Sequence, residues 1–281
     1  MHATPTTRAA REQARRQRAR KSIAVSATAT AVVIVGVALA IVFSPGWRTV
    51  RETYLSWHYF KQVLPSLPGG FWLDVRIFLI VEVVVLALGL AIALIRTMRA
   101  PVLYPVRVVA AVFVDVMRGV PLLILLYLFA FGLSALGFSF IPGSYTILGA
   151  AALACCYSAY VSEVFRAGIQ SVHPSQPAAG LALGLTRTQT LRHVVLPQAV
   201  RAVVPPLLND FIGLTKDVAL VSILGPQEIA RIAQINADLY FNYTPYVAAA
   251  AFYLVITLPL IRIVDRMRSR GLERQNALVL M

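Results

Sequence analysis

Six long apolar segments constrain this chain more than any other feature, because each is long enough to cross a lipid bilayer. They lie at about residues 23–43, 72–95, 108–133, 146–165, 203–224 and 244–264. A crossing needs about 20 apolar residues, and in hydrocarbon such a run must pair its own backbone amides by forming a helix. Only 14% of the residues are charged, against roughly 25% in a soluble domain. The sequence therefore predicts an all-α membrane protein with six transmembrane helices.

The basic residues are distributed unevenly between the segments that alternate across the membrane. Nineteen of the 26 Lys and Arg lie in the arm 1–22, near 96–107, in 166–201 and from Arg262 onward. The positive-inside rule therefore predicts that both termini are cytosolic. It makes 44–70 an extracytoplasmic loop and 266–281 a cytosolic tail. The net charge of +14 does not indicate nucleic acid binding, because no nucleic-acid-binding motif accompanies it.

The first apolar segment has two interpretations. Its basic flank and the sequence Ala38-Leu39-Ala40 are typical of a signal peptide with its cleavage site. The apolar run, however, continues to Phe43, which is long for the core of a signal. We expect a retained helix at 23–43.

No catalytic or metal-binding pattern is recognisable in the sequence. Cys155 and Cys156 are adjacent in an expected helix, where a bond between neighbours is implausible, and the four histidines are scattered rather than spaced as metal ligands. No Gly-x-x-x-x-Gly-Lys-Ser/Thr loop is present to cradle ATP phosphates. We expect no catalytic residue, metal or cofactor in this chain.

The segment 166–201 carries more structural signals than a connecting loop needs. Ser175 is expected to cap a short helix at its N-terminus, and Gly184 is expected to end it in the left-handed conformation. Thr186 begins a capping box for a second helix, which we expect to end before Pro197. The apolar residues of such a projection need a covering partner. A cytosolic, protein-binding helical projection is predicted.

This projection resembles the cytosolic signature loop of ABC importer permeases, which has a Glu-Ala-Ala triplet, a later glycine and an Ile-Leu-Pro-like ending. The corresponding residues are Ala178-Ala179-Gly180, Gly184 and Val195-Leu196-Pro197. The chain is most similar to the branch that takes up polar amino acids such as histidine, arginine, glutamate and glutamine. Further elements of that branch follow in order: Arg118-Gly119-Val120-Pro121, Tyr160, Glu163, Arg166, Gly168 and Ile169, Leu196–Ala199, Pro205-Pro206, Lys216-Asp217 and Ser222–Gly225.

The resemblance implies a five-helix type I permease core at 71–265, preceded by the additional helix 23–43 and the basic arm 1–22. It implies two ATPase subunits that bind ATP, a second permease chain, identical or homologous, and an extracytoplasmic solute-binding protein in a bacterial plasma membrane. Closure of the ATPases would switch the pathway between its two facing states. The residues expected to contact the ATPase are Ser175, Ala178, Ala179, Gly180, Gly184, Leu196 and Pro197.

Two residues depart from the signature triplet. Ala178 replaces its acidic residue, which forfeits half of a capping box worth about 1 kcal/mol. Gly180 replaces its last alanine, which costs a helix about 1 kcal/mol more. We expect a coupling helix that is less stable without its partner.

Ionisable residues within spans are expensive, at about 2.5–3.5 kcal/mol each near the membrane centre. Glu163 lies close to Arg166 at the end of its helix and is expected to be architectural. Pro205-Pro206 is either a hinge or a simple helix start. The residues expected to line the translocation pathway or its gate are Glu82, Asp115, Arg118, Pro121, Glu163, Asn209, Lys216 and Asp217.

The partners of the charged residues are open from sequence alone. Asp115 and Arg118 are three residues apart on one helix, so they either pair with each other or contact substrate. Glu82 and Lys216 lie at equal depth and either pair or leave Glu82 to meet a cationic solute. Asp217 is a further partner or lines the pathway.

Two other classes of membrane protein fit the composition. An ion-gradient-driven secondary transporter should show internal repeats and discontinuous helices, and we find no convincing repeat. A non-transporting assembly or sensor subunit would have no use for the ordered set of permease motifs. We therefore expect an ABC importer permease for a polar amino acid whose identity the sequence does not specify.

Overall fold

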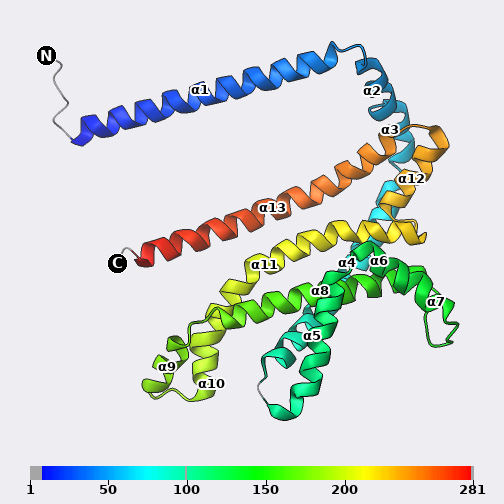
Figure 1. Ribbon diagram of the computed structural model, residues 1–281. Coiled ribbons are helices and arrows are strands. Elements are labelled where there is room, and N and C mark those ends of the chain that lie inside the picture. The colour runs from blue at the N-terminus through cyan, green and yellow to red at the C-terminus, as the bar shows by residue number, and fades with distance from the viewer. Residues whose placement is uncertain (1–7, 99, 280–281) are drawn as a thin grey trace. The chain divides into compact units, whose positions relative to one another are not determined.

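The computed structural model describes the backbone of residues 8–98 and 100–279, and every regular element in these ranges is helical (Figure 1). The chain divides into two compact units, Met1–Ser56 and Trp57–Met281.

The first unit contains the predicted helix at 23–43. Helix α1 (Arg8–Val42) joins this apolar segment to the preceding basic arm without a break, because alanine, arginine and glutamine all favour helices. Its part Lys21–Val42 is 22 residues long, which is enough for one crossing. Pro45 and Gly46 follow its end, and the short amphipathic helix α2 (Trp47–Tyr54) comes after them.

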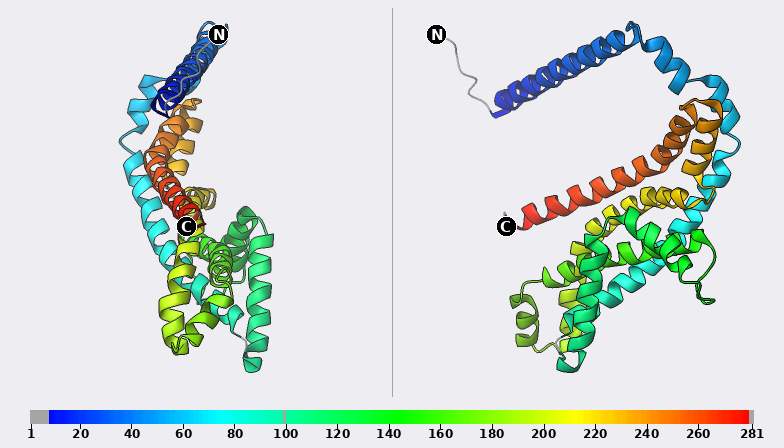
Figure 2. Two further views of the ribbon diagram at one scale, coloured as in Figure 1. Left: turned by 90° about the vertical axis from the view of Figure 1, so that its left-hand side faces the viewer. Right: turned by 45° about the vertical axis from the view of Figure 1, so that its right-hand side comes forward.

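The second unit is built around α4 and α8, which pack along each other (Figure 2). Helix α8 also packs against α5 and α11, and α12 packs against α4 and α13. The buried side chains between these helices include Val81, Val85, Leu153 and Leu214. The helices of the unit are α3 (Trp57–Val63), α4 (Leu67–Thr97), α5 (Tyr104–Gly119), α6 (Leu122–Tyr127), α7 (Leu133–Ala135), α8 (Tyr145–Gln170), α9 (Ser175–Ala182), α10 (Arg187–Thr190), α11 (Leu196–Asp217), α12 (Ile229–Tyr240) and α13 (Thr244–Val279).

Glycines allow the long helices to approach closely. A Cβ atom at Gly89 of α4 would lie 2.7 Å from Cγ1 of Val161 in α8. At Gly168 of α8 it would lie 2.0 Å from Cγ2 of Val203 in α11. Small residues at helix contacts are typical of membrane proteins, where close van der Waals packing stabilises association.

The third predicted span, 108–133, is not one straight helix. Helix α5 ends at Gly119, Val120 is extended with φ −90° and ψ 131°, and α6 begins at Leu122. The helical stretches on the two sides of this break are bent by 109°. Pro121 explains the break, since proline disfavours the helical conformation in the residue before it. A π-helical turn (Leu128–Gly132) then joins α6 to α7.

The fifth predicted span, 203–224, begins earlier than expected. Helix α11 starts at Leu196, passes through Pro205 and Pro206, and continues as a 3₁₀ turn (Val218–Leu224) that ends at the left-handed Gly225. The interpretation of the proline pair as a helix start is therefore wrong.

Four described helical stretches are long and apolar enough for a crossing, and the bent pair makes up to five. They are Lys21–Val42, Leu67–Thr97, Tyr145–Gln170 and Thr244–Met267. Helix α11 is not among them, because polar residues such as Asn209 and Asp210 interrupt its apolar sequence.

The predicted helical projection consists of α9 and α10, beside the ends of α8 and α11 (Figure 2). Gly184 has φ +85° as predicted, and Thr186 forms the predicted capping box with Gln189. Ser175 does not cap α9, because Pro174 occupies the cap position and the Ser175 hydroxyl lies 2.8 Å from Nδ1 of His173.

The second helix of the projection does not end before Pro197. A π-helical turn (Leu191–Val195) carries α10 directly into α11. Pro197 stands at the start of α11, just after this wide turn, where its missing N–H and its ring are accommodated. The projection and α11 are therefore one continuous helical path.

Candidate translocation cavity and coupling surface

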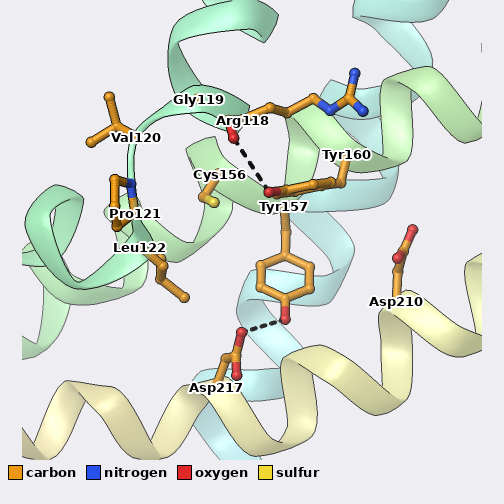
Figure 3. A pocket seen from close by; sticks show the side chains of 10 residues that line it. All are labelled: Arg118, Gly119, Val120, Pro121, Leu122, Cys156, Tyr157, Tyr160, Asp210 and Asp217. Atoms are coloured by element: carbon orange, nitrogen blue, oxygen red, sulfur yellow. Dashed lines mark hydrogen bonds between the residues drawn. The ribbon is translucent and has the colours of Figure 1, made fainter.

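A cavity of about 460 Å³ lies where α5, α8 and α11 meet (Figure 3). Its wall combines the break after α5 with two tyrosines of α8 and two carboxylates of α11. The lining residues are Arg118, Gly119, Val120, Pro121, Leu122, Cys156, Tyr157, Tyr160, Asp210 and Asp217.

The break at Val120 and Pro121 gives the cavity its positively charged side. The carbonyl of Arg118, at the end of α5, accepts a hydrogen bond of 3.5 Å from the Tyr160 hydroxyl. The Arg118 guanidinium lies over the Tyr160 ring, 5.5 Å from its centre. This cation–π contact orients the cation and leaves its N–H donors unpaired with any described carboxylate.

The carboxylates of α11 form the opposite side of the cavity. Asp210 and Asp217 are seven residues apart, two turns of one helix face. The Tyr157 hydroxyl donates a 2.7 Å hydrogen bond to Asp217, as Figure 3 shows. Oδ2 of Asp210 is buried and has no hydrogen-bond partner among the described residues. The cavity therefore contains two carboxylates on the side opposite Arg118: Asp217 is hydrogen-bonded to Tyr157, and Oδ2 of Asp210 has no described partner.

The structure brings only some of the expected pathway residues together. Arg118, Pro121 and Asp217 line the cavity, whereas Glu82, Asp115, Asn209, Glu163 and Lys216 do not. The predicted ion pair between Asp115 and Arg118 is absent from the described salt bridges, because both side chains are exposed and Arg118 turns to Tyr160.

The predicted pair between Glu82 and Lys216 is also absent from the described salt bridges. Lys216 is exposed on α11, and Glu82 instead lies close enough to Asp210 for the two carboxyl groups to interact electrostatically. Equal depth in the membrane was therefore no guide to contact.

Glu163 has an architectural position, as expected. One of its carboxylate oxygens binds Arg96 of α4, and the other binds Arg166 at 2.5 Å. Arg166 also donates to Gln170 at 3.1 Å. Because these residues join the ends of α4 and α8, they brace the helix pair beside the projection.

Sequence reasoning missed Asp210 and Tyr157. The spacing of Asp210 and Asp217 on one helix face was a usable signal. No signal pointed to Tyr157, because a tyrosine in an apolar segment is ordinary. No group of three or more potential metal ligands occurs among the described residues.

The projection exposes the apolar surface that its sequence predicted. Ala178, Ala179, Leu181 and Leu183 are exposed, and Leu183 retains 83% of its accessible surface. Gly180 instead faces inward, and a Cβ atom there would lie 3.1 Å from Cγ2 of Thr190 in the neighbouring helix. The replacement of alanine by Gly180 thus permits close contact within the projection, in addition to its cost in helix propensity.

The end of α9 is closed by backbone hydrogen bonds. The N–H of Gly184 donates to the carbonyl of Leu181 at 3.0 Å, and the N–H of Leu185 donates to the carbonyl of Gly180 at 3.1 Å. This pair of bonds is a Schellman motif, which requires the left-handed residue. The projection is thus an ordered surface.

Comparison with known proteins identifies the relatives of the chain. It is 36% identical to a probable amino-acid ABC transporter permease protein of Sinorhizobium fredii over 208 residues, 72% of this chain and 87% of the relative. It is 34% identical to the probable glutamine ABC transporter permease protein GlnM of Bacillus subtilis over 174 residues, 62% of this chain and 78% of the relative.

Solved structures of ABC transporters have the same fold. A chain of an amino acid ABC transporter crystallised with histidines matches with a TM-score of 0.68 and 34% identity, over 76% of this chain and 98% of that chain. The inward-facing MetNI methionine ABC transporter matches with a TM-score of 0.56 and 19% identity, over 72% of this chain and 95% of that chain.

The predicted resemblance to ABC importer permeases is confirmed, and these relatives give no support to the ion-gradient-driven alternative. Residues 104–270, more than half of the chain, match the family described as "Binding-protein-dependent transport system inner membrane component", and the protein belongs to this family.

Proposed function

We propose that this protein forms the translocation pathway of an ATP-driven importer of polar amino acids in a bacterial plasma membrane. The observation that carries the choice of solute is the cavity with Arg118 on one side and the unpaired carboxylate of Asp210 on the other. A free amino acid carries a carboxylate and an ammonium group, and these two residues complement both charges. The volume of about 460 Å³ lies within the roughly 300–1,000 Å³ of small-molecule sites. The relatives named above as amino-acid permeases support the same solute class.

The energy enters through the projection formed by α9 and α10. Its exposed leucines provide an apolar surface for a groove on a separate ATPase subunit, which binds and hydrolyses ATP; this chain needs no cofactor of its own. Because α10 runs through the π-turn into α11, movement of the docked projection is transmitted along the helix that carries Asp210 and Asp217. Two permease chains, two ATPases and an extracytoplasmic solute-binding protein complete the importer.

The distribution of basic residues supports the orientation. Both termini and the projection lie in the cytosol, whereas α2, α3 and α12 lie on the extracytoplasmic side.

Uptake by the reconstituted importer tests the solute class. The permease, its ATPase and its binding protein are placed in proteoliposomes with ATP on the ATPase side, and uptake of labelled polar amino acids is measured. We expect Asp210→Asn to lower uptake about tenfold or more, since a charged hydrogen bond contributes about 1.5–3 kcal/mol. Asp238→Asn on α12, an exposed carboxylate outside the cavity, is the matched control. Equal uptake by wild type and Asp210→Asn would contradict the assigned site, and no amino-acid uptake by wild type would contradict the function.

Co-purification tests the coupling surface. We expect Leu183→Ser to weaken association with the ATPase about tenfold or more, because burial of a leucine side chain contributes about 1.5–3 kcal/mol. Phe140→Ser changes a comparably exposed apolar residue, at 79% against 83%, outside the projection. Loss of ATPase with both variants, or with neither, would refute this docking surface.

A further inference from the structure

Two carboxyl groups that the transport cavity does not use meet in the interior of the second unit. Asp74 of α4 is 3% exposed, and Glu228, immediately before α12, is 0% exposed. The two groups lie within hydrogen-bonding reach of each other. None of the salt bridges among the described residues involves either of them.

Glu228 has the partners of a carboxylate. Its Oε1 accepts a 2.6 Å hydrogen bond from the N–H of Arg231, and its Oε2 accepts one of 2.9 Å from the N–H of Ala230. These donors are the free amides of the first turn of α12, which a negative side chain caps. Burial raises the pKa of the Glu228 carboxyl, whereas these two N–H bonds favour its ionised form.

Asp74 lacks the partners that a carboxylate would need. Its Oδ2 accepts a 2.9 Å hydrogen bond from the Tyr253 hydroxyl of α13. Its Oδ1 is buried without a hydrogen-bond partner among the described groups. Two ionised carboxylates in contact, away from water and without a cation, repel each other strongly. A proton on Oδ1 removes this repulsion and provides the missing hydrogen bond.

We propose that Asp74 keeps a proton in the folded protein and donates it from Oδ1 in a hydrogen bond to the Glu228 carboxylate. The pair then links α4 to the start of α12, and Tyr253 adds α13 to the same network. Gly70 permits this contact, since a Cβ atom there would lie 2.8 Å from the backbone nitrogen of Ile229.

Few other titratable groups accompany the pair. On α12, Arg231 donates to Gln234 at 2.8 Å. On α4, Arg76 is exposed. Tyr253 of α13 is the hydroxyl partner already described. The bound proton is therefore the positive charge that compensates the second carboxylate.

The proton makes the stability of this region depend on pH with a definite sign. An unfolded aspartate loses its proton near pH 4, so above that pH the folded state binds one proton more than the unfolded state. Stability then falls as the pH rises, by up to about tenfold in the unfolding constant per pH unit. The fall ends once the folded pair also loses its proton.

Infrared spectroscopy of the assembled transporter tests the proposal directly. We expect a carbonyl stretch of a protonated carboxylic acid at pH 7 that disappears in Asp74→Asn, shifts in Glu228→Gln and is unchanged in Asp238→Asn. A band that survives Asp74→Asn, or is lost rather than shifted in Glu228→Gln, overturns the assignment. Should Asp74→Asn fail to assemble, a shift of the band in Glu228→Gln supports the proposal, and an unshifted or absent band overturns it.

Thermal stability provides a second readout that does not depend on the transported solute. Asparagine can donate a hydrogen bond to Glu228 and accept one from Tyr253, so Asp74→Asn should change the free energy of unfolding only slightly. In a chain of this size, such a change keeps the melting temperature at pH 7 within about 2 °C of wild type. Asp74→Asn should also lose the fall in stability toward alkaline pH, and Asp74→Ala should melt lower. If wild type is stabilised by sodium but not by choline, and Asp74→Asn loses that effect, a bound cation replaces the proton and the proposal fails.

Discussion

Replacement of Gly168 by alanine should separate the two helices that enclose the cavity. Gly168 lies on α8, where a Cβ atom would be 2.0 Å from Cγ2 of Val203 and 3.3 Å from the carbonyl oxygen of Ala199. Val203 is only 6% exposed, so its side chain has little room to turn away. The same contact explains why a glycine stands at position 168, between Arg166 and Ile169.

The loss of stability expected for Gly168→Ala is the difference between two opposing effects. Overpacking of a filled interior costs about 1–3 kcal/mol, and a 2.0 Å approach points to the upper end. Alanine recovers about 1 kcal/mol over glycine within a helix, so the net loss for Gly168→Ala should be about 2 kcal/mol. Val203→Ala alone should also cost about 2 kcal/mol, from two buried methyl groups at about 0.8 kcal/mol each and the resulting cavity.

The double variant distinguishes this explanation from a general intolerance of change. Val203→Ala removes the atom at 2.0 Å and leaves the Val203 Cβ at 3.3 Å, so Gly168→Ala/Val203→Ala should lose only about 1 kcal/mol in place of the additive 4 kcal/mol. In thermal melting of the purified transporter, Gly168→Ala should melt about 4–8 °C below wild type. Gly132→Ala, with its nearest neighbour 4.0 Å away, should not be destabilised. Additive losses in the double variant would refute the steric explanation.

Three further changes test individual contacts. Gly184→Ala should lower the stability of the projection by about 1 kcal/mol, because φ is +85° at this position, and should weaken ATPase co-purification about fivefold. Asparagine tolerates this conformation, so Gly184→Asn should weaken co-purification less. Equal ATPase binding by wild type and both variants would contradict the need for a left-handed residue at position 184. Glu163→Gln should lower the free energy of unfolding by about 1–2 kcal/mol, because it leaves two partly exposed arginines without their carboxylate. An unchanged melting temperature would contradict a bracing role for Glu163. Tyr157→Phe removes the 2.7 Å donor of Asp217, so uptake of a cationic amino acid relative to a neutral one should rise, and a constant ratio would show that Asp217 does not face the solute.

Hydropathy predicted the helical class and most of the long helices, because burial in lipid requires both an apolar sequence and internal backbone pairing. It did not predict the bend at Val120, since averaging over about 19 residues conceals one extended residue. It also placed the start of α11 too late, because the polar residues before Val203 lowered the apolar average. Local signals gave mixed results within the projection. Gly184 and the capping box of Thr186 formed as expected, whereas Ser175 does not cap α9 and Pro197 does not end the second helix.

The candidate site was predicted in part. Arg118 and Asp217 were found because charged residues are rare in apolar segments and are retained where they face a cavity. The predicted pairs failed because position along a span gives depth but not the rotation of the helix about its axis. Lys216 illustrates this, since it adjoins Asp217 in sequence but is exposed on another face of α11. Grouping the residues of α11 by helix face would have joined Asp210 to Asp217.

Prolines show most clearly how the surroundings decide the outcome of a local signal. Pro121 interrupts a helix, whereas Pro205 and Pro206 lie within α11. Non-helical backbone at membrane depth is tolerated where it borders a polar cavity or is buried in protein. Val120 and Pro121 line such a cavity, and the Tyr160 hydroxyl supplies a partner for the carbonyl of Arg118 at the broken helix end. Pro205 and Pro206 are not among the residues that line it, so continuing the helix leaves fewer backbone groups unpaired than breaking it. The two outcomes follow from one requirement, that as few backbone groups as possible at this depth remain unpaired.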